Sequence, residues 1–215
     1  MTDKTLNLRH LGLCEYLPIS QAMQTFTATR QAHDPDEIWL LQHPPVFTQG
    51  QAGKPEHILD PGNIPVIQTD RGGQVTYHGP GQLVVYCLFN LETLGIGIRC
   101  LVNGLENSII ALLADHNILA HRQEKAPGIY VDGKKIASIG LRVRRGFTYH
   151  GLAFNIDMDL TPFDRINPCG YPNLMVTQLK DLGGITDINR IADEIISHLC
   201  KEFGYNATHL NNCGI

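Results

Sequence analysis

A glycine-rich stretch near the middle of the chain runs directly into an apolar segment. Residues 71–82 (RGGQVTYHGPGQ) hold four glycines, and residues 83–89 (LVVYCLF) have the β-branched and aromatic character of a buried strand. The glycine pair permits positive φ and close approach of backbone to a ligand, and the Gly-Pro-Gly favours a tight turn. Residues 74–78, between the turns, are predicted to form a strand. The stretch is therefore either an ordinary hairpin or a stiff frame that holds backbone N–H groups, an arginine and a histidine beside a core strand.

Composition places the chain among ordinary globular proteins. Of its 215 residues, 43% are hydrophobic and 18% are charged, so it can bury a core. No linker or internal repeat divides it, and we expect one catalytic domain over residues 1–215. The formal charge of −4 argues against a nucleic-acid partner. No apolar run is long enough to span a bilayer and no signal-peptide pattern opens the chain, so we expect a cytoplasmic protein without membrane contact.

The six cysteines and ten histidines are scattered along the chain. No C-x-x-C, no H-E-x-x-H and no Cys/His cluster at zinc spacing is present, so we expect no metal, no cofactor and no disulfide framework. Cys87, Cys100 and Cys200 fall in strand or helix patterns and are interpreted as buried small hydrophobic residues, whereas Cys213 lies in a polar tail. Cys169 differs because it stands between a proline and a glycine.

Hydrophobic periodicity predicts the elements of an α+β domain with a mixed, mostly antiparallel sheet. Helices are predicted at about residues 18–31, 97–116 and 188–203, the last ending at Gly204. Strands are predicted at residues 4–9, 37–41, 65–68, 74–78, 83–89, 129–131, 135–143 and 147–156. Asp132-Gly133 and a turn at residues 144–146 make residues 129–156 an antiparallel meander. Residues 43–53 are too rich in Pro and Gly for regular structure, and we expect about seven to nine strands in all.

The cysteine in Asn167-Pro168-Cys169-Gly170 is a candidate nucleophile. Turns on a scaffold are usually exposed, and an exposed single thiol is either a nucleophile or a harmless loop residue. A neighbouring ammonium would help the thiol to ionise, because the reference pKa of cysteine is about 8.5. Lys134 and Lys135 begin a predicted strand, so one of them points inward and the other meets solvent. The sequence alone does not select between them.

Small residues recur at alternate positions of two adjacent predicted strands. They are Ser138, Gly140, Gly151 and Ala153. Small side chains on one face of a sheet leave space above it, which suits either a slender apolar ligand or the close packing of a helix. Both interpretations remain open at this point.

Five motifs together resemble those of the bacterial lipoyl(octanoyl) transferases, and the resemblance extends over about residues 8–182. They are Arg71-Gly72-Gly73-x-x-Thr76-x-His78-Gly79-Pro80-Gly81-Gln82, Ala126-Pro127-Gly128-x-Tyr130-Val131, Lys135-Ile136-Ala137-Ser138-Ile139-Gly140, His150-Gly151-Leu152-Ala153-x-Asn155 and Asn167-Pro168-Cys169-Gly170. Any one of them alone is a weak signal, whereas the set is specific.

The resemblance implies the biotin/lipoate protein ligase-like fold and an ATP-independent acyltransferase of protein lipoylation. It implies that Cys169 carries the acyl group and that Lys135 activates this cysteine. The residues implied to line the acyl site are Arg71, Gly72, Gly73, Gln74, Val75, Thr76, Tyr77, His78, Ser138, Ile139, Gly140, Gly151, Leu152 and Ala153. His78 and His150 are interpreted either as orienting groups beside the reaction or as satisfied structural histidines.

The resemblance also implies the partners. The acyl donor would be octanoyl-acyl carrier protein, and the acceptors would be lipoyl domains of 2-oxoacid dehydrogenases and the glycine cleavage H protein. The carrier is acidic and this chain is net negative, so docking needs a local positive patch. The candidates are Lys134, Arg142, Arg144 and Arg145, which share one predicted hairpin and are otherwise interpreted as solvated charges.

Two alternative functions remain. An ATP-dependent lipoate or biotin ligase shares the fold, but it forms an acyl-adenylate and needs no nucleophilic thiol. A non-catalytic lipoyl-binding or amidotransferase-partner protein of the same fold would have no use for the pair formed by Cys169 and Lys135.

Overall fold

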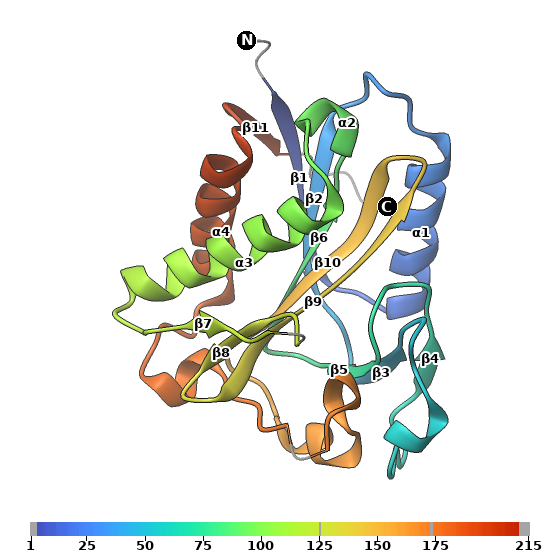
Figure 1. Ribbon diagram of the computed structural model, residues 1–215, viewed down its shortest axis with the longest axis vertical. Coiled ribbons are helices and arrows are strands. Elements are labelled where there is room, and N and C mark those ends of the chain that lie inside the picture. The colour runs from blue at the N-terminus through green and yellow to red at the C-terminus, as the bar shows by residue number, and fades with distance from the viewer. Residues whose placement is uncertain (1–3, 125, 173, 211–215) are drawn as a thin grey trace.

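The fold is built around an eight-stranded mixed sheet (Figure 1). The computed structural model describes residues 4–124, 126–172 and 174–210. The order of the strands across the sheet is β11 (Ala207–Leu210), β1 (Thr5–Leu13), β2 (Asp36–Gln42), β6 (Gln82–Leu88), β10 (Phe147–Asn155), β9 (Lys134–Arg144), β8 (Ile129–Val131) and β7 (His121–Arg122). β1 runs parallel to both of its neighbours, and the other neighbours pair antiparallel.

A second, three-stranded sheet lies at the lower end of the molecule in Figure 1. Its order is β4 (Val66–Gln68), β3 (Val46–Gln49) and β5 (Val75–His78). β3 pairs parallel with β4 and antiparallel with β5. The 3-10 turns Thr161–Arg165 and Pro168–Gly170 contact β5, and further 3-10 turns occur at Pro55–His57 and Leu179–Leu182.

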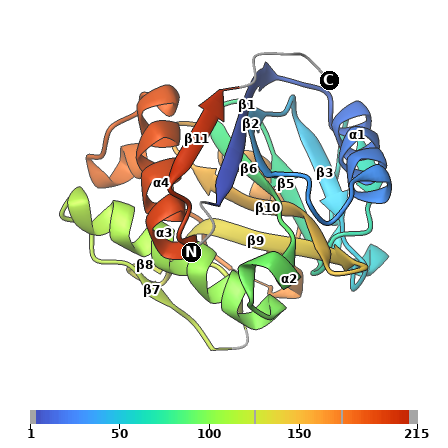
Figure 2. The ribbon, with the colours of Figure 1, turned by 90° about the horizontal axis from the view of Figure 1, so that it is seen from above.

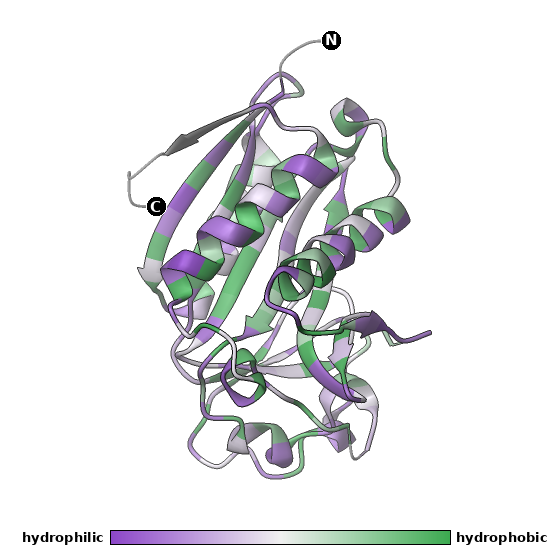
Figure 3. Ribbon diagram, turned by 90° about the vertical axis from the view of Figure 1, so that its left-hand side faces the viewer, coloured by the Kyte–Doolittle hydropathy of each residue, from purple (hydrophilic) through white to green (hydrophobic). Residues whose placement is uncertain are grey.

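Helices cover both faces of the large sheet (Figure 2). α3 (Ile98–Asp115) and α4 (Ile188–Phe203) lie on one face, α1 (Tyr16–Thr29) lies on the other, and the short α2 (Leu91–Leu94) precedes α3. Figure 3, seen from the side of α3 and α4, shows hydrophilic and hydrophobic residues alternating along both helices, as amphipathic helices require. α4 begins where the side chain of Asp187 accepts the N–H groups of Asn189 and Arg190, and it ends at Gly204, whose φ of 71° suits a helix end.

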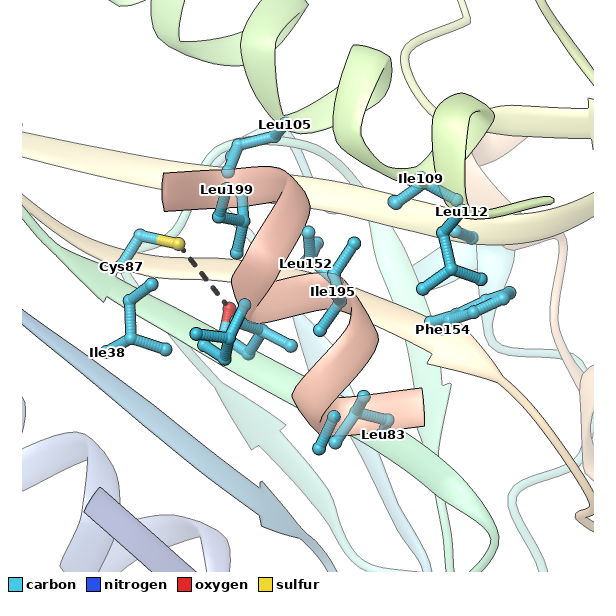
Figure 4. Packing of buried hydrophobic residues seen from close by; sticks show 14 of the residues in the cluster. Ile38, Leu83, Cys87, Leu105, Ile109, Leu112, Leu152, Phe154, Ile195 and Leu199 are labelled. Carbon is cyan, nitrogen blue, oxygen red and sulfur yellow. Dashed lines mark hydrogen bonds between the residues drawn. The ribbon is translucent and has the colours of Figure 1, made fainter. Parts of the chain in front are cut away.

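The main core lies between α3, α4 and the sheet (Figure 4). Burying these apolar side chains supplies the main favourable free energy of folding, about 25 cal/mol per Å². The Cys87 thiol lies within this core and donates to the carbonyl of Val85, at 3.9 Å. The side chains drawn together in Figure 4 include Leu105, Ile109 and Leu112 of α3, Ile195 and Leu199 of α4, and Ile38, Leu83, Leu152 and Phe154 of the sheet.

Most predicted elements occur within a few residues of their expected places. The three helices are present, and the α+β class with a mixed, largely antiparallel sheet is confirmed. The loop prediction for residues 43–53 is wrong, because Val46–Gln49 forms β3 between two strands that are distant in sequence. The described residues contain eleven strands, more than expected, since β3, β7 and β11 carry no strand pattern of their own.

Two further expectations concern cysteines and domains. Cys100 was expected to be buried, but it is exposed because it lies beside, not within, the apolar stripe of α3. Cys213 lies outside the described residues. The single domain over residues 1–215 stays a prediction. None of the described helices is long and apolar enough to cross a membrane.

Candidate active site

The glycine-rich stretch forms a frame between the two sheets. β5 pairs with β3 in the small sheet, whereas β6 pairs with β2 and β10 in the large one, so the ordinary-hairpin interpretation is wrong. The turn between them is tight, since the N–H of Gln82 donates to the carbonyl of Gly79 at 3.2 Å. Gly81 has a φ of 88°, and a Cβ there would lie 1.8 Å from the Asp157 carbonyl oxygen. Only glycine therefore fits at this position.

The arginine of this stretch is a buried cation. Arg71 donates from Nη2 to the Thr48 carbonyl at 2.6 Å and from Nη1 to the Gly72 carbonyl at 2.9 Å. The Gly72 N–H in turn donates to the carbonyl of Leu141 at 2.9 Å, which fastens the frame to β9. Burial lowers the pKa of Arg71. Within the described residues no carboxylate forms an ion pair with this guanidinium, so its charge is available to a ligand.

The candidate nucleophile occupies a strained turn. Cys169 lies on the 3-10 turn Pro168–Gly170 with a φ of 56° and a ψ of 16°, a left-handed conformation that is uncommon outside glycine. Such conformations cluster at functional sites, where the surroundings hold them in place. The turn packs beside β5, and the thiol is half-buried.

The two lysines of β9 point in different directions. Lys135 is 2% exposed and its Nζ donates to the Cys169 sulfur at 3.0 Å and to the Pro127 carbonyl at 2.9 Å, whereas Lys134 is exposed. A register shift beside Lys135 places it opposite Tyr130, while Ala137 lies opposite Ile129. Such bulges re-aim side chains next to sites. The structure thus selects Lys135 as the inward lysine.

The charge of Lys135 is coupled to that of the thiol. Burial alone would lower the pKa of Lys135, but the neighbouring Cys169 thiolate and then Tyr130 outweigh burial, and the pKa is raised. The amine therefore stays an ammonium at neutral pH, and an ammonium beside sulfur favours the thiolate. The aromatic ring of Tyr130 contributes to this environment, with its centroid 5.3 Å from Nζ.

A cavity of about 400 Å³ lies beside Cys169, a size within the range of small-molecule sites. The expected substrate-binding residues that line it are Arg71, Gly72, Gly73, Gln74, Val75, Thr76, His78, Ser138, Ile139, Gly140, Gly151, Leu152 and Ala153, with His150. Tyr77 is the exception, because its ring packs away from the cavity against Phe47 and Phe163. Lining residues that the sequence analysis missed are Tyr16, Val84, Tyr86, Ile98, Val102, Ala126, Pro127, Leu141 and Tyr171.

The four small residues face one another across β9 and β10. Gly151 lies opposite Gly140, and Ala153 lies opposite Ser138. A Cβ at Gly140 would lie 3.2 Å from the Arg71 side chain and the Gly72 carbonyl, so the glycine-rich frame, not a helix, covers this position. Because all four also line the cavity, the arrangement supports the interpretation of space for a slender ligand.

Three buried histidines flank the inner wall of the cavity. The rings of His43 and His78 each hold two hydrogen bonds, to Cys14 and Tyr86 and to Gln82 and Thr48 respectively. Both rings are therefore satisfied by protein partners, which favours the structural interpretation of His78, while its orienting role stays a prediction. Burial lowers the pKa of His43 to about 4 and that of His78 to about 3.

His150 differs from these two. Its Nε2 lies 2.8 Å from Asp70 Oδ1, its Nδ1 has no protein partner, and its φ of 60° turns it and Tyr149 toward the same carboxylate. The hydrogen bond from His150 holds the pKa of Asp70 at about 2. A neutral His150 with a bare Nδ1 on the cavity wall is suited to an orienting role, which stays a prediction.

The lowered pKa values of His43 and His78 predict that the stability of the protein depends steeply on pH in the acid range. Their pKa values are lowered in the folded state, so their contribution is complete above about pH 6.5 and is lost as pH falls toward the folded values of about 4 and 3. With two protons taken up on unfolding, the free energy of unfolding should fall by about 3 kcal/mol per pH unit between pH 6 and 4. Urea titrations at several pH values should show that the free energy of unfolding of His78→Gln depends less on pH, by an amount that corresponds to about one proton. The exposed His33→Gln is the matched control, and an equal slope in all three proteins would contradict the prediction.

The expected positive patch is only partly present. Lys134 begins β9 and Arg144 ends it, which separates them by about 33 Å at the usual rise of a strand. Lys134 therefore does not belong with the arginines. Arg142 donates to the side chain of Gln51 and Arg145 to the carbonyl of Ala28, and both contacts leave the guanidinium groups near the surface.

No group of three or more His, Cys, Asp or Glu side chains that could hold a metal ion occurs in the part of the chain that the structure describes.

Solved structures define the class of fold. A lipoate-protein ligase A bound with ATP superposes with a TM-score of 0.78 at 15% identity, over 100% of this chain and 90% of that one. The biotin protein ligase of Aquifex aeolicus, in complex with biotin and ATP, gives a TM-score of 0.58 at 11% identity, over 92% of this chain and 70% of that one. The protein thus has the lipoate and biotin ligase fold, as the motifs implied.

Sequence comparison defines the family. The model of the lipoyl protein ligase A/B catalytic domain matches residues 18–204. Proteins named octanoyltransferase are 60% identical in Stutzerimonas stutzeri, over 95% of this chain and 94% of that protein, and 56% identical in Azotobacter vinelandii, over 93% and 92%. The chain belongs to the lipoyl protein ligase A/B catalytic-domain family. It is an enzyme of the acyltransferase class within that family, and the resemblance seen in the five motifs is confirmed.

Proposed function

We propose that the protein transfers an octanoyl group from octanoyl-acyl carrier protein to the ε-amine of a lysine on a lipoyl domain. The observation that carries the proposal is the 3.0 Å contact between Lys135 Nζ and Cys169 Sγ beside the apolar cavity. A thiolate stabilised by an ammonium is a nucleophile for acyl transfer. The names of the octanoyltransferase relatives support the choice of acyl group.

In the first step, the Cys169 thiolate attacks the thioester carbonyl of the donor. A C–S bond to Cys169 forms, the C–S bond to the carrier breaks, and the carrier leaves as a thiolate. One thioester replaces another, so this step is near thermoneutral and needs no ATP. The buried guanidinium of Arg71 and the backbone N–H groups of the glycine turns would stabilise the negative charge that develops on the carbonyl oxygen.

In the second step, the acceptor amine attacks the thioester on Cys169. A C–N bond forms, the C–S bond breaks, and Cys169 returns to the thiolate. The amine loses one proton in the process. The carrier thiolate released in the first step would take a proton from the Lys135 ammonium, and the neutral Lys135 amine would then accept the proton of the attacking amine, because its Nζ contacts the reacting sulfur. The resulting amide is more stable than the thioester, which drives the transfer forward.

The acceptor is proposed to be a lipoyl domain. A bipartite lipoate protein ligase from Thermoplasma acidophilum was solved in a study of its E2 lipoyl domain, and the fold shared with that ligase has a TM-score of 0.72. We propose that the acceptors of this enzyme are the lipoyl domains of 2-oxoacid dehydrogenases and the glycine cleavage H protein. We further propose that the enzyme acts in the cytoplasm.

One experiment tests the route. Mixing the protein with octanoyl-acyl carrier protein should raise its intact mass by one octanoyl group, and adding a lipoyl domain should return it to its original mass as the domain gains that group. Free octanoate with ATP and Mg²⁺ should yield neither species. If acylation of the domain instead required ATP and free octanoate, the protein would be a ligase and the proposal would be wrong.

A further inference from the structure

We infer that Glu106 is a positioning residue that acts on Lys135 through a single peptide group. The inference rests on the proposed roles of Cys169 and Lys135. Glu106 lies on α3, on the stripe that also holds Val102 and Ile109, and it is 5% exposed. A carboxylate in such a place is costly unless it is paired and hydrogen-bonded, so its partners indicate what it is for.

Both carboxylate oxygens of Glu106 are engaged. Oε2 forms an ion pair with Arg122 Nε at 2.7 Å, and the Arg122 side chain is 40% exposed. Oε1 accepts the backbone N–H of Gly128 at 3.1 Å. The first contact anchors the carboxylate from the surface side, and the second reaches toward the active site.

The N–H of Gly128 and the carbonyl of Pro127 belong to one trans peptide group. That group is planar, and its N–H and C=O point in opposite directions. The Pro127 oxygen accepts the hydrogen bond from Lys135 Nζ at 2.9 Å, and Nζ lies 3.0 Å from the Cys169 sulfur. Glu106 therefore holds one end of a rigid plane whose other end aims the ammonium at the thiol, and rotating the plane would release both contacts.

The contact between this peptide and Lys135 is close. Gly128 has a φ of 131°, and a Cβ there would lie 2.8 Å from Lys135 Cε and 2.5 Å from the Ala137 carbonyl oxygen. Only glycine allows this approach. A carboxylate on the N–H side also polarises the peptide, which makes the Pro127 oxygen a stronger acceptor for an ammonium. Glu106 thus contributes both orientation and charge to Lys135.

Removal of the acceptor tests the inference directly. In Glu106→Ala the rate of Cys169 alkylation by iodoacetamide at neutral pH, followed by peptide mass mapping, should fall by about 10-fold, because the ammonium is no longer held against the sulfur. The kcat/KM for octanoyl transfer should fall by about 10- to 100-fold, the range found when groups that orient a functional residue are removed. Glu106→Gln keeps an oxygen that accepts from Gly128, and it should recover most of the activity and most of the alkylation rate.

Arg122→Gln is the matched control. It breaks the same ion pair but leaves the path from Glu106 to Gly128 and Lys135 intact, so the alkylation rate should not change. Should Glu106→Ala fail to fold, Glu106→Met fills the space without accepting a hydrogen bond and carries the same expectation. A wild-type alkylation rate in folded Glu106→Ala or Glu106→Met would mean that Glu106 only anchors α3, and it would overturn the inference. Alkylation reports on the sulfur itself, so this outcome is separate from any failure of the proposed transfer reaction.

Discussion

Replacing Cys169 by alanine should abolish both the acyl adduct and the transfer reaction. The sulfur is the only group at the 3.0 Å contact with Lys135 that can form a thioester, and it borders the apolar cavity. Loss of a covalent nucleophile costs about 10⁴- to 10⁶-fold in kcat, because the remaining site only binds and polarises the substrate. Octanoyl transfer to a lipoyl domain, followed by mass spectrometry, measures the loss.

Two further variants separate the chemistry from the fold. Cys169→Ser keeps the shape of the turn but offers a hydroxyl that is not ionised at neutral pH, so it should be nearly as inactive. Cys100→Ala is the matched control, because Cys100 is an exposed thiol on α3 that does not line the cavity, and it should transfer at the wild-type rate. Wild-type transfer by Cys169→Ala would instead mean that the acceptor amine attacks the carrier thioester directly.

The sequence predicted those parts of the fold that have local signals. The apolar stripe of α4, its cap at Asp187 and its end at Gly204 are local features, and the helix spans the predicted residues. β3 has no such signal, because two prolines precede it and its partners come from residues 66–68 and 75–78. Pairing with distant strands overrides local propensity in such cases. The count of strands was therefore too low.

The site was predictable in outline and not in detail. Strand alternation required that one of Lys134 and Lys135 point inward, but it did not say which. The register shift between β8 and β9 shows that the inward lysine is Lys135. Tyr77 belongs to the right strand, yet its ring fills the core of the small sheet. Glu106 had a signal that was overlooked, namely a carboxylate on an otherwise apolar helical stripe. A charged residue at such a position is a stronger indication of function than any apolar neighbour.

Lys135→Met should lower kcat by about 10²- to 10⁴-fold, the range for a positioned acid–base group, while leaving the fold intact. Its ammonium is buried and contacts both Cys169 and the Pro127 carbonyl, so methionine removes the charge while roughly keeping the volume. Removing one partner of a buried pair is destabilising when it leaves an uncompensated charge, but the Cys169 thiol can remain neutral, so the Tm should change little. A loss of activity together with an unchanged or higher Tm would assign the effect to chemistry.

The pH dependence of this variant follows from the sign of the shift. The pKa of Lys135 is raised, so in the wild type the ammonium persists through neutral pH and is lost only above about pH 10.5, its ordinary value. Any stability that the pair of Lys135 and Cys169 contributes is likewise present below about pH 10.5 and is lost as the pH rises above it. Without the ammonium, the rate of Cys169 alkylation at neutral pH should fall, because a neighbouring ammonium favours the thiolate. Lys134→Met, one residue away and exposed, should follow the wild-type profile. If both lysine variants behaved alike, the ammonium at Lys135 would have no part in forming the thiolate.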